Sequence, residues 1–270
     1  MFNKKKSKKA VIAYFHTHWD REWYREFEVF RLRLLRVFDH ILDMLEEGKI
    51  PSFYFDGQTA ALLDYLEMRP EKEVVVRKLI EEKKLFIGPF YCLVDEFLTD
   101  GITFRKNIEI GLKTARHFGC KDFIAYLADT FGHSKNIPDI LKEYGIDKAI
   151  VWRGCGDLPA EFKFNGINTV NLVRGYFMDI FSSDKNIIQK AEFLKDNLDK
   201  IASKSGDSIL LPIGADHLDV PDDVMSQIKA MNEILDDYVI VVGSPFDYFE
   251  RVKFKENFND ELRDNSKTFI

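Results

Sequence analysis

Apolar residues along this chain follow two alternating patterns, short continuous runs and longer segments in which apolar positions recur at helical spacing. Residues 10–15 form the first continuous run, which predicts a buried strand. Residues 24–47 lack Gly and Pro and repeat apolar side chains at helical spacing up to Gly48, which predicts a helix. The alternation predicts further strands at 52–55, 85–87, 123–127, 148–152, 208–213 and 238–242, and further helices at 59–68, 71–84, 104–118, 137–144, 185–203 and 224–235.

This order of elements predicts the fold class. Strands that alternate with helices indicate a parallel sheet with crossover helices. We therefore expect an α/β protein built as a (β/α) barrel of about seven parallel strands with outer helices. An open doubly wound sheet is the alternative that the pattern leaves. Residues 161–173 depart from the alternation and predict a hairpin with Asn165-Gly166 as its turn.

Composition and charge narrow the class of protein. The chain has 270 residues, of which 46% are hydrophobic and 31% charged, so it can bury the core of one barrel domain. Its net charge of −6 and the lack of a basic, aromatic stripe argue against nucleic acid as a partner. No apolar stretch reaches the length of a membrane span. Three cysteines without metal-type spacing favour reduced thiols and a cytoplasmic location. The pattern leaves a homo-oligomer possible.

Polar residues follow the predicted strands at the same end of each unit. Because the carboxyl ends of parallel barrel strands meet at one mouth, we expect these residues to lie together on a catalytic face. They are His18, Asp20, Asp56, Asp95, Asp129, Arg153 and Asp216.

The densest group of polar residues is His16-Thr17-His18-Trp19-Asp20-Arg21-Glu22-Trp23, directly after the first strand. Imidazole nitrogen and carboxylate oxygen suit zinc, and an indole offers a flat apolar face for a sugar ring. A histidine beside a strand is often only structural, but this H-x-H-x-D pattern favours a metal or catalytic role. For His16, orienting a metal ligand and a purely structural role both remain open.

A second dense motif, Ala128-Asp129-Thr130-Phe131-Gly132-His133-Ser134, ends a predicted strand. Together the two motifs resemble the paired signatures of the α-mannosidases of glycoside hydrolase family 38, in which H-x-H-x-D follows the first strand and D-x-F-G-H-S a later one. The resemblance covers essentially the whole chain and includes the bacterial-type segments Phe55-Asp56-Gly57-Gln58, Ile87-Gly88-Pro89-Phe90-Tyr91 and Trp152-Arg153-Gly154.

The resemblance implies a zinc-dependent, retaining glycoside hydrolase that cleaves α-mannosidic bonds. His18, Asp20 and Asp129 match three zinc ligands of the family, and Asp129 also matches its nucleophile. Asp216 aligns with the stretch that carries the general acid/base, with the adjacent His217 as an alternative functional group. A retaining mechanism needs such a pair of carboxyl groups on either side of the scissile bond.

Further positions match residues that contact substrate in the family. Trp23 matches an aromatic platform under the sugar, Phe131 lines the same pocket, and Arg153 matches an arginine close to substrate and nucleophile. Tyr176 falls roughly where the family places substrate-contacting aromatics, and His217 is a further candidate for substrate binding. The implied substrate is an α-mannoside, either an oligosaccharide or a small mannosylated solute.

The resemblance also implies a domain organisation. Family members are usually longer, and their fourth zinc ligand is a histidine beyond the barrel. We therefore expect residues 1–9 to form a basic tail and residues 10–255 to form the catalytic domain. Residues 256–270 would begin the connection to further C-terminal domains.

Two other functions remain open. A metal-dependent carbohydrate deacetylase also combines a barrel with His and Asp ligands at strand ends, but its metal ion would activate water. A non-catalytic carbohydrate- or metal-binding domain is the third possibility, which applies if the lack of the fourth ligand abolishes turnover.

Overall fold

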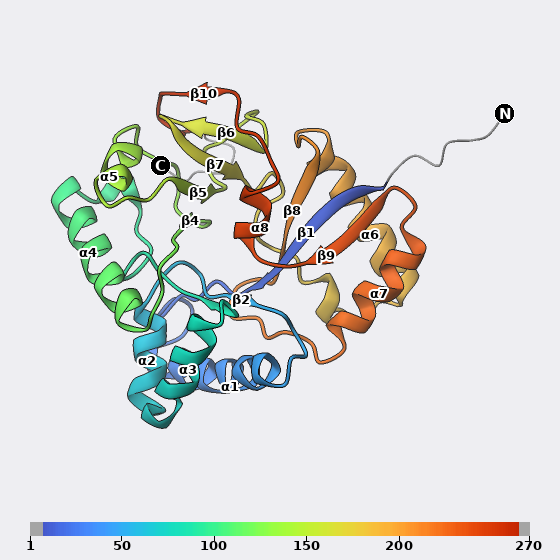
Figure 1. Ribbon diagram of the computed structural model, residues 1–270, viewed down its shortest axis with the longest axis horizontal. Coiled ribbons are helices and arrows are strands. Elements are labelled where there is room, and N and C mark those ends of the chain that lie inside the picture. The colour runs from blue at the N-terminus through green and yellow to red at the C-terminus, as the bar shows by residue number, and fades with distance from the viewer. Residues whose placement is uncertain (1–7, 265–270) are drawn as a thin grey trace.

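The first sheet is organised around β1, which is buried over most of its length and lies between β8 and β9 in Figure 1. The computed structural model describes residues 8–264. One edge of β1 pairs in parallel with β8 over six residues, and its other edge is shared by β9 and then β2, beyond which lies β3. The bounds are β1 Lys9–His16, β2 Phe53–Tyr54, β3 Leu85–Phe86, β8 Ser208–Ile213 and β9 Tyr238–Val242.

The second sheet has the strand order β10-β6-β7-β5-β4. β4, β5 and β7 are parallel, whereas β6 and β7 form the predicted antiparallel hairpin, with Asn165 and Gly166 both at positive φ in its turn. The bounds are β4 Ala125–Leu127, β5 Lys148–Val151, β6 Glu161–Phe164, β7 Ile167–Asn171 and β10 Asn257–Phe258.

The predicted α/β class is confirmed, but closure into a barrel is not. The described strands form two separate five-stranded sheets. β3 is an edge strand of the first sheet and β4 an edge strand of the second. They have only two and three residues, so they present few backbone groups to each other. At the opposite edge of the first sheet, β8 carries Pro212, which has no backbone N–H to donate to a neighbouring strand.

Helices α1 to α7 lie around the outside of the strands, whereas α8 lies among them, near β8 and β1 (Figure 1). Their bounds are α1 Phe27–Glu46, α2 Ala60–Met68, α3 Glu73–Glu81, α4 Gly101–His117, α5 Ile137–Glu143, α6 Ile187–Ala202, α7 Val224–Ile234 and α8 Pro245–Phe249. Short 3-10 turns are η1 (Pro70–Lys72), η2 (Glu96–Leu98) and η3 (Ile180–Ser182). The apolar repeat that predicted the first helix is buried in α1, including Phe30, Leu34 and Phe38. No helix within residues 8–264 is long and apolar enough to cross a membrane.

Side chains of both sheets meet in one buried cluster between them. Tyr14 of β1, Tyr54 of β2, Tyr126 of β4, Ile150 of β5 and Leu210 of β8 belong to this cluster. The two sheets therefore share a core although their edges are not joined.

Residues 257–264 pack onto this fold. β10 pairs with β6, and Leu262 and Asp264 form antiparallel bridges with His133 and Gly154. Of the predicted basic tail, only Lys8 and Lys9 lie among the described residues. Residues 265–270 of the predicted connection lie outside the described residues.

Candidate active site

Asp56 is the buried anchor of the loop that follows β1. This carboxylate, which is 0% exposed, accepts hydrogen bonds from Nδ1 of His18 at 2.9 Å, from the backbone N–H of Trp19 at 3.0 Å and from Nε2 of Gln58 at 2.7 Å. Gln58 also donates to the backbone carbonyl of Trp19 at 2.8 Å. With Nδ1 donating to a carboxylate, the orientation of the His18 ring is fixed and Nε2 points away from Asp56.

Nε2 of His18 faces the two other predicted metal ligands. It lies 3.4 Å from Oδ1 of Asp20 and 3.8 Å from Oδ2 of Asp129. Burial opposes a charge on His18, but Asp56 and Asp20 outweigh it and raise the pKa of the imidazole well above its usual range. A metal ion at Nε2 would therefore have to displace a proton.

The donor set suits zinc, although it is not a preformed centre. Two ligand atoms of a tetrahedral zinc ion are about 3.4 Å apart, close to the two distances measured from His18. An imidazole nitrogen and carboxylate oxygens are also the ligand types that zinc accepts. Within residues 8–264, however, no group of three or more His, Cys, Asp and Glu side chains is arranged to hold a metal ion.

Asp129 is held from the opposite side by Arg153. Nε of Arg153 donates to Oδ1 of Asp129 at 2.8 Å, and Nη2 donates to the same oxygen. The guanidinium lies between two rings, 4.1 Å from the centroid of Phe131 and 4.3 Å from that of Trp152. Burial raises the pKa of Asp129, and the charges of His18 and Arg153 oppose that rise. Arg153 thus fixes one oxygen of Asp129, while the other faces His18.

The loop that carries Asp129 is fastened to residues 94–98. Oδ1 of Asp95 accepts from the backbone N–H of Phe131 at 3.1 Å, and the hydroxyl of Thr130 donates to the carbonyl of Val94 at 3.1 Å. Glu96 accepts from Nδ1 of His133 at 2.9 Å. It also accepts from the backbone N–H of Ser134 at 2.8 Å. These contacts assign to Asp95 and Glu96 a supporting role that the sequence motifs had not given them.

Asp216 reaches the same site through the end of β8. Its backbone forms a parallel bridge with His18, and its Oδ1 accepts a hydrogen bond from the hydroxyl of Tyr176 at 3.0 Å. Burial raises the pKa of Asp216, and the negative charges of Asp20 and Asp129 add to the rise, although His18 and Tyr176 oppose it. Burial and the negative charges of Asp129 and Asp216 raise the pKa of Tyr176, which therefore keeps its proton. A carboxyl with a raised pKa suits a group that gives up a proton near neutral pH.

The two remaining histidines of the region brace the loops. His217, at φ 55°, donates from Nε2 to the carbonyl of Asp20 at 3.1 Å and packs between Phe30 and Trp19. Nε2 of His16 donates to the carbonyl of Tyr176 at 2.9 Å, and burial lowers the pKa of His16 to about 4. Trp23 is 65% exposed and makes a T-shaped contact with Tyr24, so most of its side chain is open to solvent.

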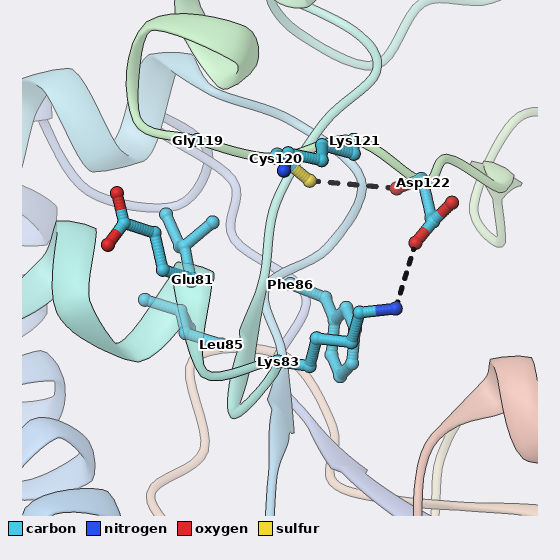
Figure 2. Close-up of a pocket in the computed structure, with 9 residues that line it drawn as sticks. Glu81, Lys83, Leu85, Phe86, Gly119, Cys120, Lys121 and Asp122 are labelled. Atoms are coloured by element: carbon cyan, nitrogen blue, oxygen red, sulfur yellow. Dashed lines mark hydrogen bonds and ion pairs between the residues drawn. The ribbon is translucent and has the colours of Figure 1, made fainter.

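A separate cavity of about 360 Å³ lies at the opposite ends of the strands, where β3 and β4 begin. Figure 2 shows its lining, in which Lys83 pairs with Asp122 and the thiol of Cys120 points to the backbone of Asp122. Burial raises the pKa of Cys120 to about 11, so this thiol stays protonated. None of the candidate site residues lines this cavity.

Comparisons with known proteins show which family the chain resembles. The model of the family described as "Glycosyl hydrolases family 38 N-terminal domain" matches residues 8–269. A protein of Halalkalibacterium halodurans described as a "putative mannosylglycerate hydrolase" is 33% identical over 97% of this chain, which covers 32% of that protein. An α-mannosidase of Saccharomyces cerevisiae is 25% identical over 58% of this chain and 15% of its own length.

Among solved structures, an α-mannosidase from Enterococcus faecalis V583 matches with a TM-score of 0.85 and 29% identity, over 94% of this chain and 31% of that one. A "putative polysaccharide deacetylase" from Mycobacterium smegmatis matches with a TM-score of 0.56 at 15% identity, which shows a related fold alone. The chain spans 32% and 31% of the lengths of the Halalkalibacterium and Enterococcus proteins, about a third in each case.

Proposed function

The chain belongs to glycosyl hydrolase family 38, as its N-terminal domain, and from this premise we propose that it carries the catalytic groups of a zinc-dependent, retaining α-mannosidase. One observation carries the proposal. Asp20 and Asp129 both face Nε2 of His18, whose other ring nitrogen is held by the buried Asp56.

In this proposal Asp129 is the nucleophile that attacks the anomeric carbon. Arg153 holds one carboxylate oxygen of Asp129, so the side chain is oriented before substrate arrives. Asp216 protonates the leaving oxygen and then accepts a proton from water. The hydrogen bond from Tyr176 orients the Asp216 carboxyl. The raised pKa of Asp216 favours the protonated form that the first step needs.

His18, Asp20 and Asp129 would hold the zinc ion. When bound, zinc acts as a Lewis acid and a template for sugar hydroxyls. Phe131 lies against Arg153 beside the nucleophile, and the largely exposed indole of Trp23 is available for stacking on a sugar. The substrate is an α-mannoside, an oligosaccharide or a small mannosylated solute, and the name of the Halalkalibacterium relative supports the second.

Covalent trapping tests the nucleophile. Incubation with a fluorinated mannoside is expected to label Asp129, located by peptide mass spectrometry, because a retaining enzyme accumulates a glycosyl-enzyme. Asp129→Ala should prevent labelling and lower aryl α-mannoside hydrolysis by about three orders of magnitude. Asp139→Ala, which alters an exposed carboxylate of α5, is the matched control. Normal turnover by Asp129→Ala would refute the proposal, and turnover of an acetylated sugar without labelling would support the deacetylase alternative.

Zinc content tests the metal. After removal of metal with a chelator and titration with zinc, the wild type should bind one ion and His18→Ala should bind it far more weakly. Asp56→Asn should weaken binding about 10- to 100-fold, because it loosens the orientation of His18. Equal zinc affinity of wild type and both variants, measured by elemental analysis and calorimetry, would exclude this site.

A further inference from the structure

Phe177 is an exposed aromatic residue fixed between two rings of the candidate site. Its ring stacks on that of Tyr176, with centroids 4.2 Å apart and an angle of 28°. It also meets Trp152 edge-on at 5.7 Å. The neighbours Tyr176 and Met178 are 1% and 5% exposed, whereas Phe177 is 42% exposed. One part of a rigidly held ring is therefore left open to solvent.

Contacts on either side connect Phe177 to both candidate carboxylates. Tyr176, beneath it, donates its hydroxyl to Asp216, and Met178 is joined to Gly214 by two backbone hydrogen bonds. Trp152, beside it, packs against the guanidinium of Arg153. Phe177 is thus linked through Tyr176 to Asp216 and through Trp152 and Arg153 to Asp129, and Asp216 is the nearer of the two along these contacts.

The position of the general acid determines which part of a substrate meets Phe177. A general acid lies within hydrogen-bond reach of the oxygen it protonates, so the leaving group lies beside Asp216. We propose that Phe177 is the platform on which a ring-shaped leaving group, such as a second pyranose, rests its apolar face. This inference rests on the proposed function and adds to it a contact that the oligosaccharide kind of substrate would make and a small solute without a ring in its leaving group would not.

Three α-mannosides with different leaving groups test the platform. Mannobiose releases a sugar ring, mannosylglycerate a small acid without a ring, and α-mannosyl fluoride a single atom. In Phe177→Ala, we expect kcat/KM for mannobiose to fall about tenfold relative to kcat/KM for mannosyl fluoride, because an aromatic contact is lost only by the first. Mannosylglycerate should follow the fluoride, and Phe177→Tyr should restore the wild-type ratio.

A matched control separates the platform from general loss of an exposed ring. Phe193 on α6 is 44% exposed, so Phe193→Ala removes an equally exposed ring outside the site and should keep the wild-type ratio. Equal losses for mannobiose and mannosyl fluoride in Phe177→Ala would show that Phe177 acts only through Tyr176 and Asp216. Unchanged kcat/KM for both substrates would show that it does not touch the leaving group, and either result overturns the proposal.

A binding measurement distinguishes failure of this inference from failure of the proposed function. If the wild type hydrolyses no α-mannoside, the proposed function fails. Calorimetric titration then compares mannobiose with mannose in wild type and Phe177→Ala. A roughly tenfold loss of affinity for mannobiose relative to mannose supports the platform, and an equal affinity ratio in both proteins contradicts it.

Discussion

Asp56 and Glu96 perform the same task on two different loops, since each is a buried carboxylate that accepts from Nδ1 of a histidine and from a nearby backbone N–H. The histidine motifs are visible in the sequence, because the spacing of H-x-H-x-D and D-x-F-G-H-S is unusual. Asp56 was expected on the same face as His18, but the pairing of each histidine with its carboxylate was not, because His18 and Asp56 are 38 residues apart and His133 and Glu96 are 37 apart. Asp95-Glu96 has no local pattern that separates loop support from helix capping.

His40 shows the same kind of long-range pairing at the surface, and it leads to a pH prediction. Nδ1 of His40 lies 2.9 Å from Oδ1 of Asp219 and Nε2 lies 3.2 Å from Oδ1 of Asp222, both in the loop that follows Asp216. Burial lowers the pKa of His40, but the two carboxylates outweigh it and raise the pKa above its usual value. Lys49, near Asp222, is the other cation of the group.

Because the folded pKa is higher than the unfolded one, the stabilising contribution of His40 is complete below the unfolded pKa and disappears as the pH rises through the folded pKa. We expect His40→Gln to lower the free energy of unfolding at pH 5.5 by up to about 1 kcal/mol, since solvent partly screens His40 and both of its carboxylate partners. At pH 9 the difference should be smaller. Urea unfolding at both pH values measures it, and a difference that grows with pH would contradict the assignment.

At the scale of elements, the sequence predicted best where a local pattern decides the structure. The apolar repeat of α1 and the Asn-Gly turn between β6 and β7 are both local, and both predictions are confirmed. β10 was not predicted, because two residues become a strand only through pairing with β6. Residues 262–264 were likewise assigned to a connection, yet they bridge the loops that carry Asp129 and Arg153 through His133 and Gly154.

Gly154 allows the backbone of residues 262–264 to approach closely, and Gly145 provides a control for testing this. Gly154 has a φ of +81°, and a Cβ added there would lie 2.1 Å from the carbonyl oxygen of Leu262. Gly145 has a similar φ of +74° but no atom within 4 Å of such a Cβ. Gly145→Ala should therefore cost about 1–2 kcal/mol of stability from backbone strain alone. Gly154→Ala should cost about 1–3 kcal/mol more from the clash. Urea unfolding measures the loss of stability in both variants. Equal losses would show that residues 262–264 move away without cost.

At the scale of the whole molecule, the two sheets are joined through their core rather than their edges. Sequence alternation predicted the strands and their order along the chain, but it carries no information on which sheet edges meet. Closure depends on the lengths of β3 and β4 and on the packing between the sheets, both of which are set by tertiary contacts. Tyr14 from the first sheet and Tyr126 from the second meet inside the core, where both are at most 1% exposed.

The hydroxyls of Tyr14 and Tyr126 are 3.2 Å apart and one donates to the other, with the rings edge-on at 6.5 Å. Removing one hydroxyl leaves its partner buried without that bond, so Tyr14→Phe and Tyr126→Phe should each lower the free energy of unfolding by about 1–2 kcal/mol. Removing both leaves no orphaned group, so the double variant should lose about 1 kcal/mol less than the sum of the single losses.

Urea unfolding of the four proteins, followed by tryptophan fluorescence and circular dichroism, measures this coupling. If the sheets unfold as one unit, both probes give the same midpoint in every protein. Additive losses or separate midpoints would show that the sheets are energetically independent despite their common core.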